Sequence, residues 1–216
     1  MTPSTILGVV LAFVPGYLLG SLNFAVIVSR LYAHDDVRRH GSGNAGMTNM
    51  LRTYGKFPAL LTALGDIFKG TASVWIGRLA FALLGISFMD GGYLGGIAAL
   101  LGHLFPLYFG FKGGKGVLVS AGALLAINPL NLLVLAVIFV PFVFLVKIVS
   151  LTSILAAICY PIVTYLTAKF LHWGGDPLAD AGMALIFSVI VIYMHRDNIK
   201  RLLNGTESRF GQKKHS

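Results

Sequence analysis

Long stretches without a charged side chain constrain this sequence more than any other feature. Ile6–Val28 spans 23 uncharged residues and Val117–Val146 spans 30, against the roughly 20 apolar residues with which a helix crosses a bilayer. Of the 216 residues, 56% are hydrophobic and 12% are charged, whereas about a quarter of a soluble domain is charged. So few charges exclude a soluble enzyme, a disordered chain and a disulfide-stapled module. The sequence predicts an all-α integral membrane protein, with residues 1–216 as a single polytopic domain.

The apolar runs and the residues that separate them predict seven transmembrane helices. These spans are Ile6–Val28, Gly70–Met89, Tyr93–Phe111, two helices within Val117–Val146, Ile148–Ala168 and Ala181–Met194. Asn128-Pro129-Leu130-Asn131 predicts a tight turn within the longest run, because proline disfavours helix in the residue before it. The last span is short unless Pro177–Asp180 extend it. Met1–Ser4 is too short and lacks the positive charge that begins a signal peptide.

The excess of 17 Lys and Arg over 8 Asp and Glu predicts the orientation. Cytoplasmic loops of membrane proteins collect Lys and Arg, which explains a basic chain without invoking nucleic acid. With seven spans and a cytoplasmic loop 30–56, the same side receives Lys112, Lys115, Lys147 and the tail from Arg196 to Lys214. The other side then receives Asp90, the Asn128–Asn131 turn, Lys169, Asp176 and Asp180. We therefore expect the N-terminus outside and the C-terminus in the cytoplasm.

Three polar segments on this predicted cytoplasmic side contain more than loop solubility requires. The first, residues 41–52, reads GSGNAGMTNMLR. Its glycines permit positive φ, its backbone N–H groups are suited to an anion-binding nest, and Arg52 offers a bidentate fork for phosphate. A flexible loop rich in Gly, Ser and Asn explains the same composition, so both interpretations stay open.

The second segment, Gly110–Gly116, places two lysines among glycines. It is not a Walker A loop, because Gly116 stands where that motif requires Ser or Thr, so nucleotide binding is not indicated. One interpretation is a phosphate cradle at the start of a membrane helix, whose dipole favours anions. The other is a loop that its lysines hold at the lipid headgroups.

The third segment, residues 195–207, reads HRDNIKRLLNGTE. His195 and Asn198 are three positions apart and share one face of a helix. An amphipathic basic helix on the inner leaflet explains the cations of this segment but not these two side chains. Gly205 has the position of a helix C-cap.

Four further polar residues lie within or beside the predicted spans. Asp66 and Lys69 are one helical turn apart, and they either pair with each other or line a polar pocket. Arg78, within a span, requires a carboxylate, carbonyl groups or water. His103 fits hydrogen-bonded packing better than catalysis. The sequence has no cluster with metal-ligand spacing, so we expect no metal and no other cofactor.

Together the segments resemble the cytoplasmic motifs of the bacterial acyl-phosphate:glycerol-3-phosphate acyltransferases, the PlsY family. The matching runs are GSGNAGMTNMLR (41–52), GHLFPLYFGFKGGKGV (102–117) and HRDNIKRLLNGTE (195–207). DIFKG (66–70) resembles a further family element. The family commonly has Val-Ala-Thr after Gly116, whereas this chain has Val117-Leu118-Val119, so a hydroxyl contact at position 119 is not expected.

The resemblance implies a seven-helix, multi-pass enzyme of the bacterial cytoplasmic (inner) membrane with its active site facing the cytoplasm. Such an enzyme transfers an acyl group from acyl phosphate to the sn-1 hydroxyl of glycerol 3-phosphate and yields lysophosphatidic acid and phosphate. The implied catalytic positions are Ser42, Arg52, Lys115, His195 and Asn198. The implied substrate- or phosphate-binding positions are Gly41, Gly43, Asn44, Thr48, Asn49, Lys112, Gly113, Gly114 and Glu207, with Asp66, Lys69 and His103 in a second rank. Membrane lipids and the soluble enzyme that produces acyl phosphate are the candidate partners.

The residues fit this chemistry, because an acyl phosphate is already activated and requires mainly positioning and electrostatic stabilisation. We expect Arg52, Lys115 and the glycine-loop amides to bind phosphate groups and the developing oxyanion, and the third segment to orient glycerol 3-phosphate. Either His195 or a substrate phosphate oxygen takes the hydroxyl proton. Ser42 is either an acyl carrier or a hydrogen-bond donor, and the donor is favoured because no base is assigned to it.

Two other classes of function compete with the acyltransferase. An organophosphate transporter also needs basic loops, but its polar residues gather near the bilayer midplane, often in inverted repeats. Here the polar residues gather on one side and no internal repeat is visible. A non-enzymatic scaffold leaves the glycine-rich loops unexplained.

Overall fold

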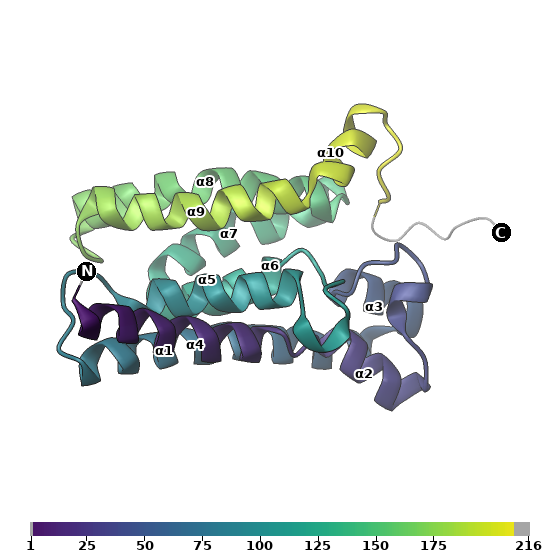
Figure 1. Cartoon of the computed structure of the whole chain (residues 1–216). Helices are drawn as coiled ribbons and strands as arrows, with labels where there is room; N and C mark the ends of the chain where they lie inside the picture. The colour runs from purple at the N-terminus through teal and green to yellow at the C-terminus, as the bar shows by residue number, and fades with distance from the viewer. Residues whose placement is uncertain (1, 210–216) are drawn as a thin grey trace. The chain divides into compact units, whose positions relative to one another are not determined.

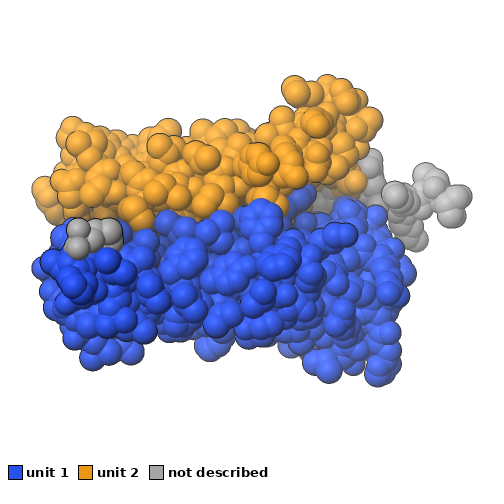
Figure 2. Space-filling model, in the orientation of Figure 1, with its two compact units in different colours: residues 1–127 blue, residues 128–216 orange. Residues whose placement is uncertain are grey.

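A computed structural model describes residues 2–209, and every regular element within that range is helical (Figure 1). The chain forms two compact units, residues 1–127 and residues 128–216 (Figure 2). The all-helical class predicted from the apolar runs is confirmed for the described residues.

Unit 1 is organised around one long helix, α4. Its elements are α1 (Pro3–Gly20), α2 (Phe24–Ala33), the 3-10 turn η1 (Val37–Arg39), α3 (Met47–Tyr54), α4 (Lys56–Leu83), α5 (Gly91–Leu104), the 3-10 turn η2 (Leu107–Phe109) and α6 (Val117–Ile127). All five of the other α-helices pack against α4. α1 also packs closely on α5, where a Cβ at Gly20 would lie 2.3 Å from the carbonyl oxygen of Ala99. Small residues of this kind let helices approach each other where hydrophobic burial between them contributes little.

Unit 2 contains α7 (Pro129–Val146), α8 (Val149–Leu171), α9 (Pro177–Met194) and the short α10 (Arg196–Leu203). α8 packs against α7 and α9, and α10 contacts α8 and α9. Buried Asn131 on α7 donates to Thr164 on α8 over 3.1 Å and accepts from Thr167 over 2.6 Å. These bonds satisfy polar groups in an apolar setting and tie α7 to α8.

Two boundaries expected from helix-stop signals are confirmed. The run 117–146 is broken between Ile127 and Pro129, where Asn128 accepts from the backbone N–H of Asn131 over 3.0 Å and caps α7. Pro177–Asp180 do extend the last long helix, which Asp176 caps at its N-terminus. Proline in the first helical turn loses no hydrogen bond, because the N–H groups there have no intrahelical partner.

Other boundaries predicted from hydropathy are wrong. The helix expected over Gly70–Met89 begins at Lys56 and ends at Leu83, since Asp66 and Lys69 pair with each other inside it and need no water. The helix expected over Tyr93–Phe111 ends at Leu104.

The first predicted span, Ile6–Val28, is not one continuous helix. It is interrupted at residues 21–23, where Asn23 accepts from the backbone N–H of Val26 over 3.1 Å and starts α2. The apolar pattern predicted helix over this run, but the cap at Asn23 divides it into α1 and α2.

Within the described residues, five helical segments are long and apolar enough to cross a membrane by length and composition. They are Pro3–Ala33, Gly91–Phe109, Pro129–Val146, Val149–Leu171 and Pro177–Met194. α6 is apolar but has only 11 residues, and α4 is long but includes four charged side chains, Lys56, Asp66, Lys69 and Arg78. The structure thus gives five candidate spans where the sequence pattern gave seven.

Arg78 on α4 has the polar partners that its charge requires. Arg78 donates from Nη2 to Asp90 over 2.7 Å and from Nη1 to the carbonyl oxygen of Ala126 over 2.8 Å. Asp90 also caps α5 by accepting from Gly92 over 2.8 Å. The predicted need of Arg78 for a carboxylate or carbonyl partner is confirmed, and the interaction links α4, α5 and α6.

Candidate active site

Asn49 shapes the first polar loop of unit 1. This buried residue of α3 donates from Nδ2 to the carbonyl oxygens of Val37 (3.1 Å) and His40 (3.0 Å). Its Oδ1 accepts from the backbone N–H of Ser42 over 3.0 Å. These three hydrogen bonds tie α3 to the backbone of the loop at residues 37, 40 and 42.

Gly41 fits the same arrangement for a steric reason. Its φ is +60°, and a Cβ there would lie 2.2 Å from Oδ1 of Asn49. The loop is therefore built around a glycine at this position. Ser42 and Gly43 lie exposed on it, and Asn44 and Thr48 are half-buried.

The second polar loop folds back over the end of α5. The backbone N–H groups of Gly113 and Gly114 donate to the carbonyl oxygens of Leu104 (3.2 Å) and His103 (3.3 Å). In this structure the two N–H groups hold the loop, whereas the sequence analysis expects the glycine-loop amides to bind phosphate. The lysine side chains of the loop stay as the candidate phosphate ligands, with Lys112 exposed and Lys115 half-buried.

Gly114 brings the first two predicted segments together. A Cβ at this position would lie 2.7 Å from the carbonyl oxygen of Ala45 and 2.3 Å from Nε2 of His103. The first loop, the end of α5 and the second loop therefore meet at a residue that has room for no side chain. Arg52 lies exposed in the last turn of α3.

The second-rank residues form a buried cluster in unit 1. Nζ of Lys69 lies 2.9 Å from Oδ1 of Asp66, as an ion pair rather than a well-aligned hydrogen bond. The same ammonium donates to the carbonyl oxygen of Leu22 over 2.8 Å and lies 3.0 Å from Nδ1 of His103. The predicted ion pair and the hydrogen-bonded packing of His103 are both confirmed. The cluster supports the α1–α2 junction and the end of α5 and is fully buried.

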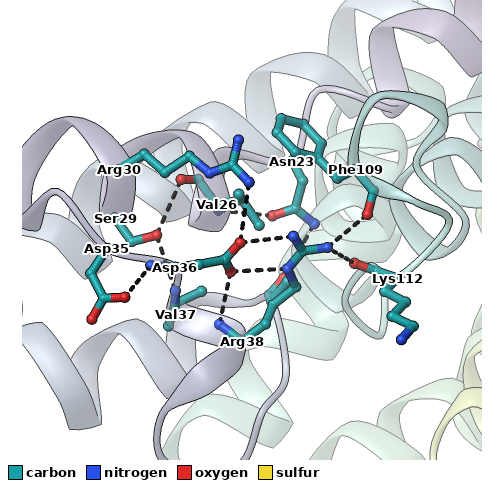
Figure 3. A network of polar contacts seen from close by, with 11 residues as sticks. Asn23, Val26, Ser29, Arg30, Asp35, Asp36, Val37, Arg38, Phe109 and Lys112 are labelled. Atoms are coloured by element: carbon teal, nitrogen blue, oxygen red, sulfur yellow. Dashed lines mark hydrogen bonds and ion pairs between the residues drawn. The ribbon is translucent and has the colours of Figure 1, made fainter.

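The sequence analysis did not single out Asp36 and Arg38, which come shortly before the first segment. Arg38 donates to Asp36 from Nε over 2.9 Å and from Nη2 over 2.7 Å (Figure 3). The hydrogen bonds from Arg38 hold the pKa of Asp36 well below its ordinary value, against partial burial, which raises it. The only sign of this ion pair in the sequence was an acidic residue two positions before an arginine.

Glu207 is the centre of the polar site in unit 2. Its Oε1 accepts from Asn198 over 2.7 Å and from Ser150 over 2.8 Å, and its Oε2 accepts from Arg201 over 2.7 Å. Burial raises the pKa of Glu207, but the hydrogen bonds from Ser150, Asn198 and Arg201 outweigh it and hold that pKa below its ordinary value. The structure therefore brings Asn198 and Glu207 together, as two of the predicted positions.

His195 lies at the junction of α9 and α10 and is buried. Its Nδ1 lies 2.8 Å from the carbonyl oxygen of Val191, which requires a proton on Nδ1 and places the lone pair of a neutral ring on Nε2. Gly205 follows the last residues of α10 with a φ of +67°, as its predicted capping position requires. Lys213 and Lys214, counted in the basic tail, lie outside the described residues.

Residues 2–209 contain no group of three or more His, Cys, Asp or Glu side chains placed to hold a metal ion.

Comparison with known proteins identifies the family. The family model for glycerol-3-phosphate acyltransferase matches residues 10–205. The chain belongs to the glycerol-3-phosphate acyltransferase family. Apart from Thr206 and Glu207, all three polar segments lie inside the matched range.

Curated members of this acyltransferase family match almost the whole chain. Glycerol-3-phosphate acyltransferase of Clostridioides difficile is 43% identical over 201 residues, which cover 93% of this chain and 95% of that protein. The protein of the same name from Burkholderia pseudomallei is 44% identical over 207 residues, which cover 95% and 97%. The resemblance to the PlsY family drawn from the motifs is thereby confirmed.

Two solved structures of such acyltransferases share the fold. Crystal structures of PlsY (YgiH), described as an integral membrane glycerol 3-phosphate acyltransferase, match in a glycerol 3-phosphate form and a lysophosphatidic acid form. The first has a TM-score of 0.80 at 34% identity and covers 94% of this chain and 96% of that one. The second has a TM-score of 0.77 at 33% identity and covers 97% and 96%. With its apolar helices, this family member is an integral membrane protein.

Proposed function

We propose that this protein transfers a fatty acyl group from acyl phosphate to the sn-1 hydroxyl of glycerol 3-phosphate. The hydroxyl oxygen attacks the acyl carbon, the bond from that carbon to the phosphate oxygen breaks, and inorganic phosphate leaves with the electron pair. The products are lysophosphatidic acid and phosphate, and the reaction is an early step of phospholipid synthesis. The match to a PlsY structure in its glycerol 3-phosphate form, over 94% of this chain, is the observation that carries the proposal.

In this proposal the loops of unit 1 bind phosphate groups through side chains. Arg52 and Lys115 provide the charge, and Ser42, on its exposed loop, donates a hydrogen bond. Glycines hold these loops at fixed positions, so their cations need little reorganisation when charge develops on the acyl oxygen. Lys112, Asn44 and Thr48 are supporting binding positions.

The polar site of unit 2 orients glycerol 3-phosphate in the same proposal. Asn198, held by Glu207, and His195 provide the contacts. Nε2 of His195 has the lone pair that a general base needs, and a substrate phosphate oxygen is the other acceptor for the hydroxyl proton.

We further propose that the chain has seven spans in one functional domain of the bacterial inner membrane, with the N-terminus outside and the active site in the cytoplasm. α4 and α6 are the two spans added to the five segments that qualify by length and composition. The asymmetric distribution of Lys and Arg supports this orientation. Membrane lipids surround the helices, and the soluble producer of acyl phosphate is the proposed partner.

The comparisons favour the acyltransferase over an organophosphate transporter, because the matching family and both solved structures are named as acyltransferases. The donor is tested with purified protein, radiolabelled glycerol 3-phosphate and one of three donors: acyl phosphate, acyl coenzyme A or acyl-loaded acyl carrier protein. We expect labelled lysophosphatidic acid from acyl phosphate alone. Product formed only from either thioester would overturn the proposed donor.

A further inference from the structure

We infer that Asp36 and Arg38, the Asp36–Arg38 clasp, position the lysine-bearing loop 109–116 for the proposed reaction. The clasp lies in and beside η1 and outside the three motif segments. Its role rests on the proposed function, since it concerns the loop whose lysines are proposed to bind phosphate.

The clasp is a bidentate ion pair that leaves the third guanidinium nitrogen, Nη1, for other partners. Asp36 accepts from Nε and Nη2 of Arg38, and Arg30 adds a longer contact of 3.3 Å. Both partners are largely shielded, with side-chain exposures of 12% for Asp36 and 21% for Arg38. A planar guanidinium held on two sides has little freedom to turn.

This third nitrogen of Arg38 holds the second loop. Nη1 donates to the carbonyl oxygens of Phe109, over 2.7 Å, and Lys112, over 3.2 Å (Figure 3). A single nitrogen thus bridges the two ends of the turn 109–112, and one of those ends is the backbone of a proposed phosphate ligand.

The turn that Arg38 bridges has an unfavourable backbone. Gly110 and Phe111 both have positive φ, of +66° and +58°. Glycine tolerates that region, but a phenylalanine in it is disfavoured. Such a conformation persists only where the surroundings determine it, and the two bonds from Arg38 close the turn around it.

The other side of the clasp reaches the first loop. The carbonyl oxygen of Val37, between the two clasp residues, accepts from Asn49, whose Oδ1 in turn accepts from the backbone N–H of Ser42. Through these hydrogen bonds, residues 36–38 fix the position of the backbone at both Ser42 and Lys112. Loss of these contacts is therefore expected to lower catalysis by displacing both loops.

The test uses Arg38→Gln, with Arg39→Gln as the matched control. Arg39 is the next residue of η1, is exposed and carries the same charge. We expect Arg38→Gln to lower kcat/KM for acyl phosphate by about 10- to 100-fold, the size of effect that a misplaced group produces. Arg39→Gln should change it less than about twofold. Arg38→Lys should recover only part of the loss, because an ammonium lacks the fork.

Hydrogen exchange of residues 109–116 in the same variants tests the clasp independently of activity. Arg38→Gln should speed exchange in this loop by about tenfold and leave the transmembrane helices unchanged, while Arg39→Gln should leave the loop as it is. Unchanged exchange in Arg38→Gln would overturn the clasp, and faster exchange with normal kcat/KM would overturn its positioning role. A wild-type protein that makes no product from acyl phosphate would reject the proposed function, while hydrogen exchange still decides whether the clasp holds the loop.

Discussion

Nδ2 of Asn198 donates a hydrogen bond to Oε1 of Glu207 over 2.7 Å. The same carboxylate is bonded to Ser150 near the start of α8 and to Arg201 on α10. One acidic side chain after the last helix therefore fixes the orientation of an amide proposed to bind the acceptor substrate.

Replacing Glu207 by Gln should lower kcat/KM for glycerol 3-phosphate by about tenfold, which corresponds to about 1.4 kcal/mol. The substitution keeps the size of the side chain but removes charge-assisted hydrogen bonds, which contribute about 1.5–3 kcal/mol each. Asp197→Asn, at an exposed position of α10, removes the same charge and serves as the control. Steady-state kinetics that show equal losses in both variants would contradict a specific role for Glu207.

Acid should destabilise the protein partly through Glu207. Because the folded-state pKa of this carboxyl lies below its ordinary value of 4.5, its stabilising effect is present above that value. The effect is lost as the pH falls through the folded-state pKa. Thermal unfolding midpoints of wild type and Glu207→Gln should therefore differ most near neutral pH, and the difference should shrink as the pH falls below the ordinary pKa of 4.5. A difference that stays constant over this range would argue against the linkage.

Gly114→Ala should reduce both stability and activity. The added Cβ would lie 2.3 Å from Nε2 of His103 and 2.7 Å from the carbonyl oxygen of Ala45, both well inside the 3.4–4 Å of ordinary van der Waals contact. Overpacking of this kind costs about 1–3 kcal/mol. Gly182→Ala on α9, where a Cβ would meet nothing within 4 Å, is the control and should be neutral or slightly stabilising. Thermal unfolding and turnover of the two variants compare them directly.

Lys69→Met should be among the most damaging substitutions in unit 1. The methionine is unbranched and one atom shorter than lysine, and it leaves the buried Asp66 carboxylate without its cation; breaking a buried pair from one side costs about 3–5 kcal/mol. The double variant Asp66→Asn/Lys69→Met should lose less than the sum of the two single losses, because it leaves no unpaired charge. Strictly additive shifts in unfolding free energy would show that the pair is not coupled.

Local signals in the sequence were sufficient for several features of the fold. Asn128-Pro129 stops one helix and starts the next by side-chain capping and a fixed φ, and both effects act within a few residues. The charge of Arg78 predicted a polar partner within the protein, because the lipid around a membrane helix offers none. Such features are readable because their physical cause lies in neighbouring residues or in the membrane itself.

Features that depend on contacts between distant parts of the chain could not be predicted from the sequence. The start of α4 at Lys56 depends on Asp66 and Lys69 pairing with each other and on the contacts of Lys69 with the carbonyl oxygen of Leu22 and with His103, which come from two other parts of the chain. The sequence suggested the backbone N–H groups of Gly113 and Gly114 as anion-binding donors, but in the structure they donate to carbonyl oxygens at the end of α5. The contact of Arg38 with Lys112 joins residues 74 positions apart, and no local pattern indicates it.

The most direct test of the proposed chemistry is the rate of lysophosphatidic acid formation by Lys115→Ala with saturating acyl phosphate and glycerol 3-phosphate. Lys56→Ala, which removes an exposed lysine outside both loops, provides the matched control. Loss of a preorganised cation at the developing charge should lower the rate by at least about 100-fold, with Lys56→Ala close to wild type. A wild-type rate in Lys115→Ala would contradict the assignment of the second loop to phosphate binding.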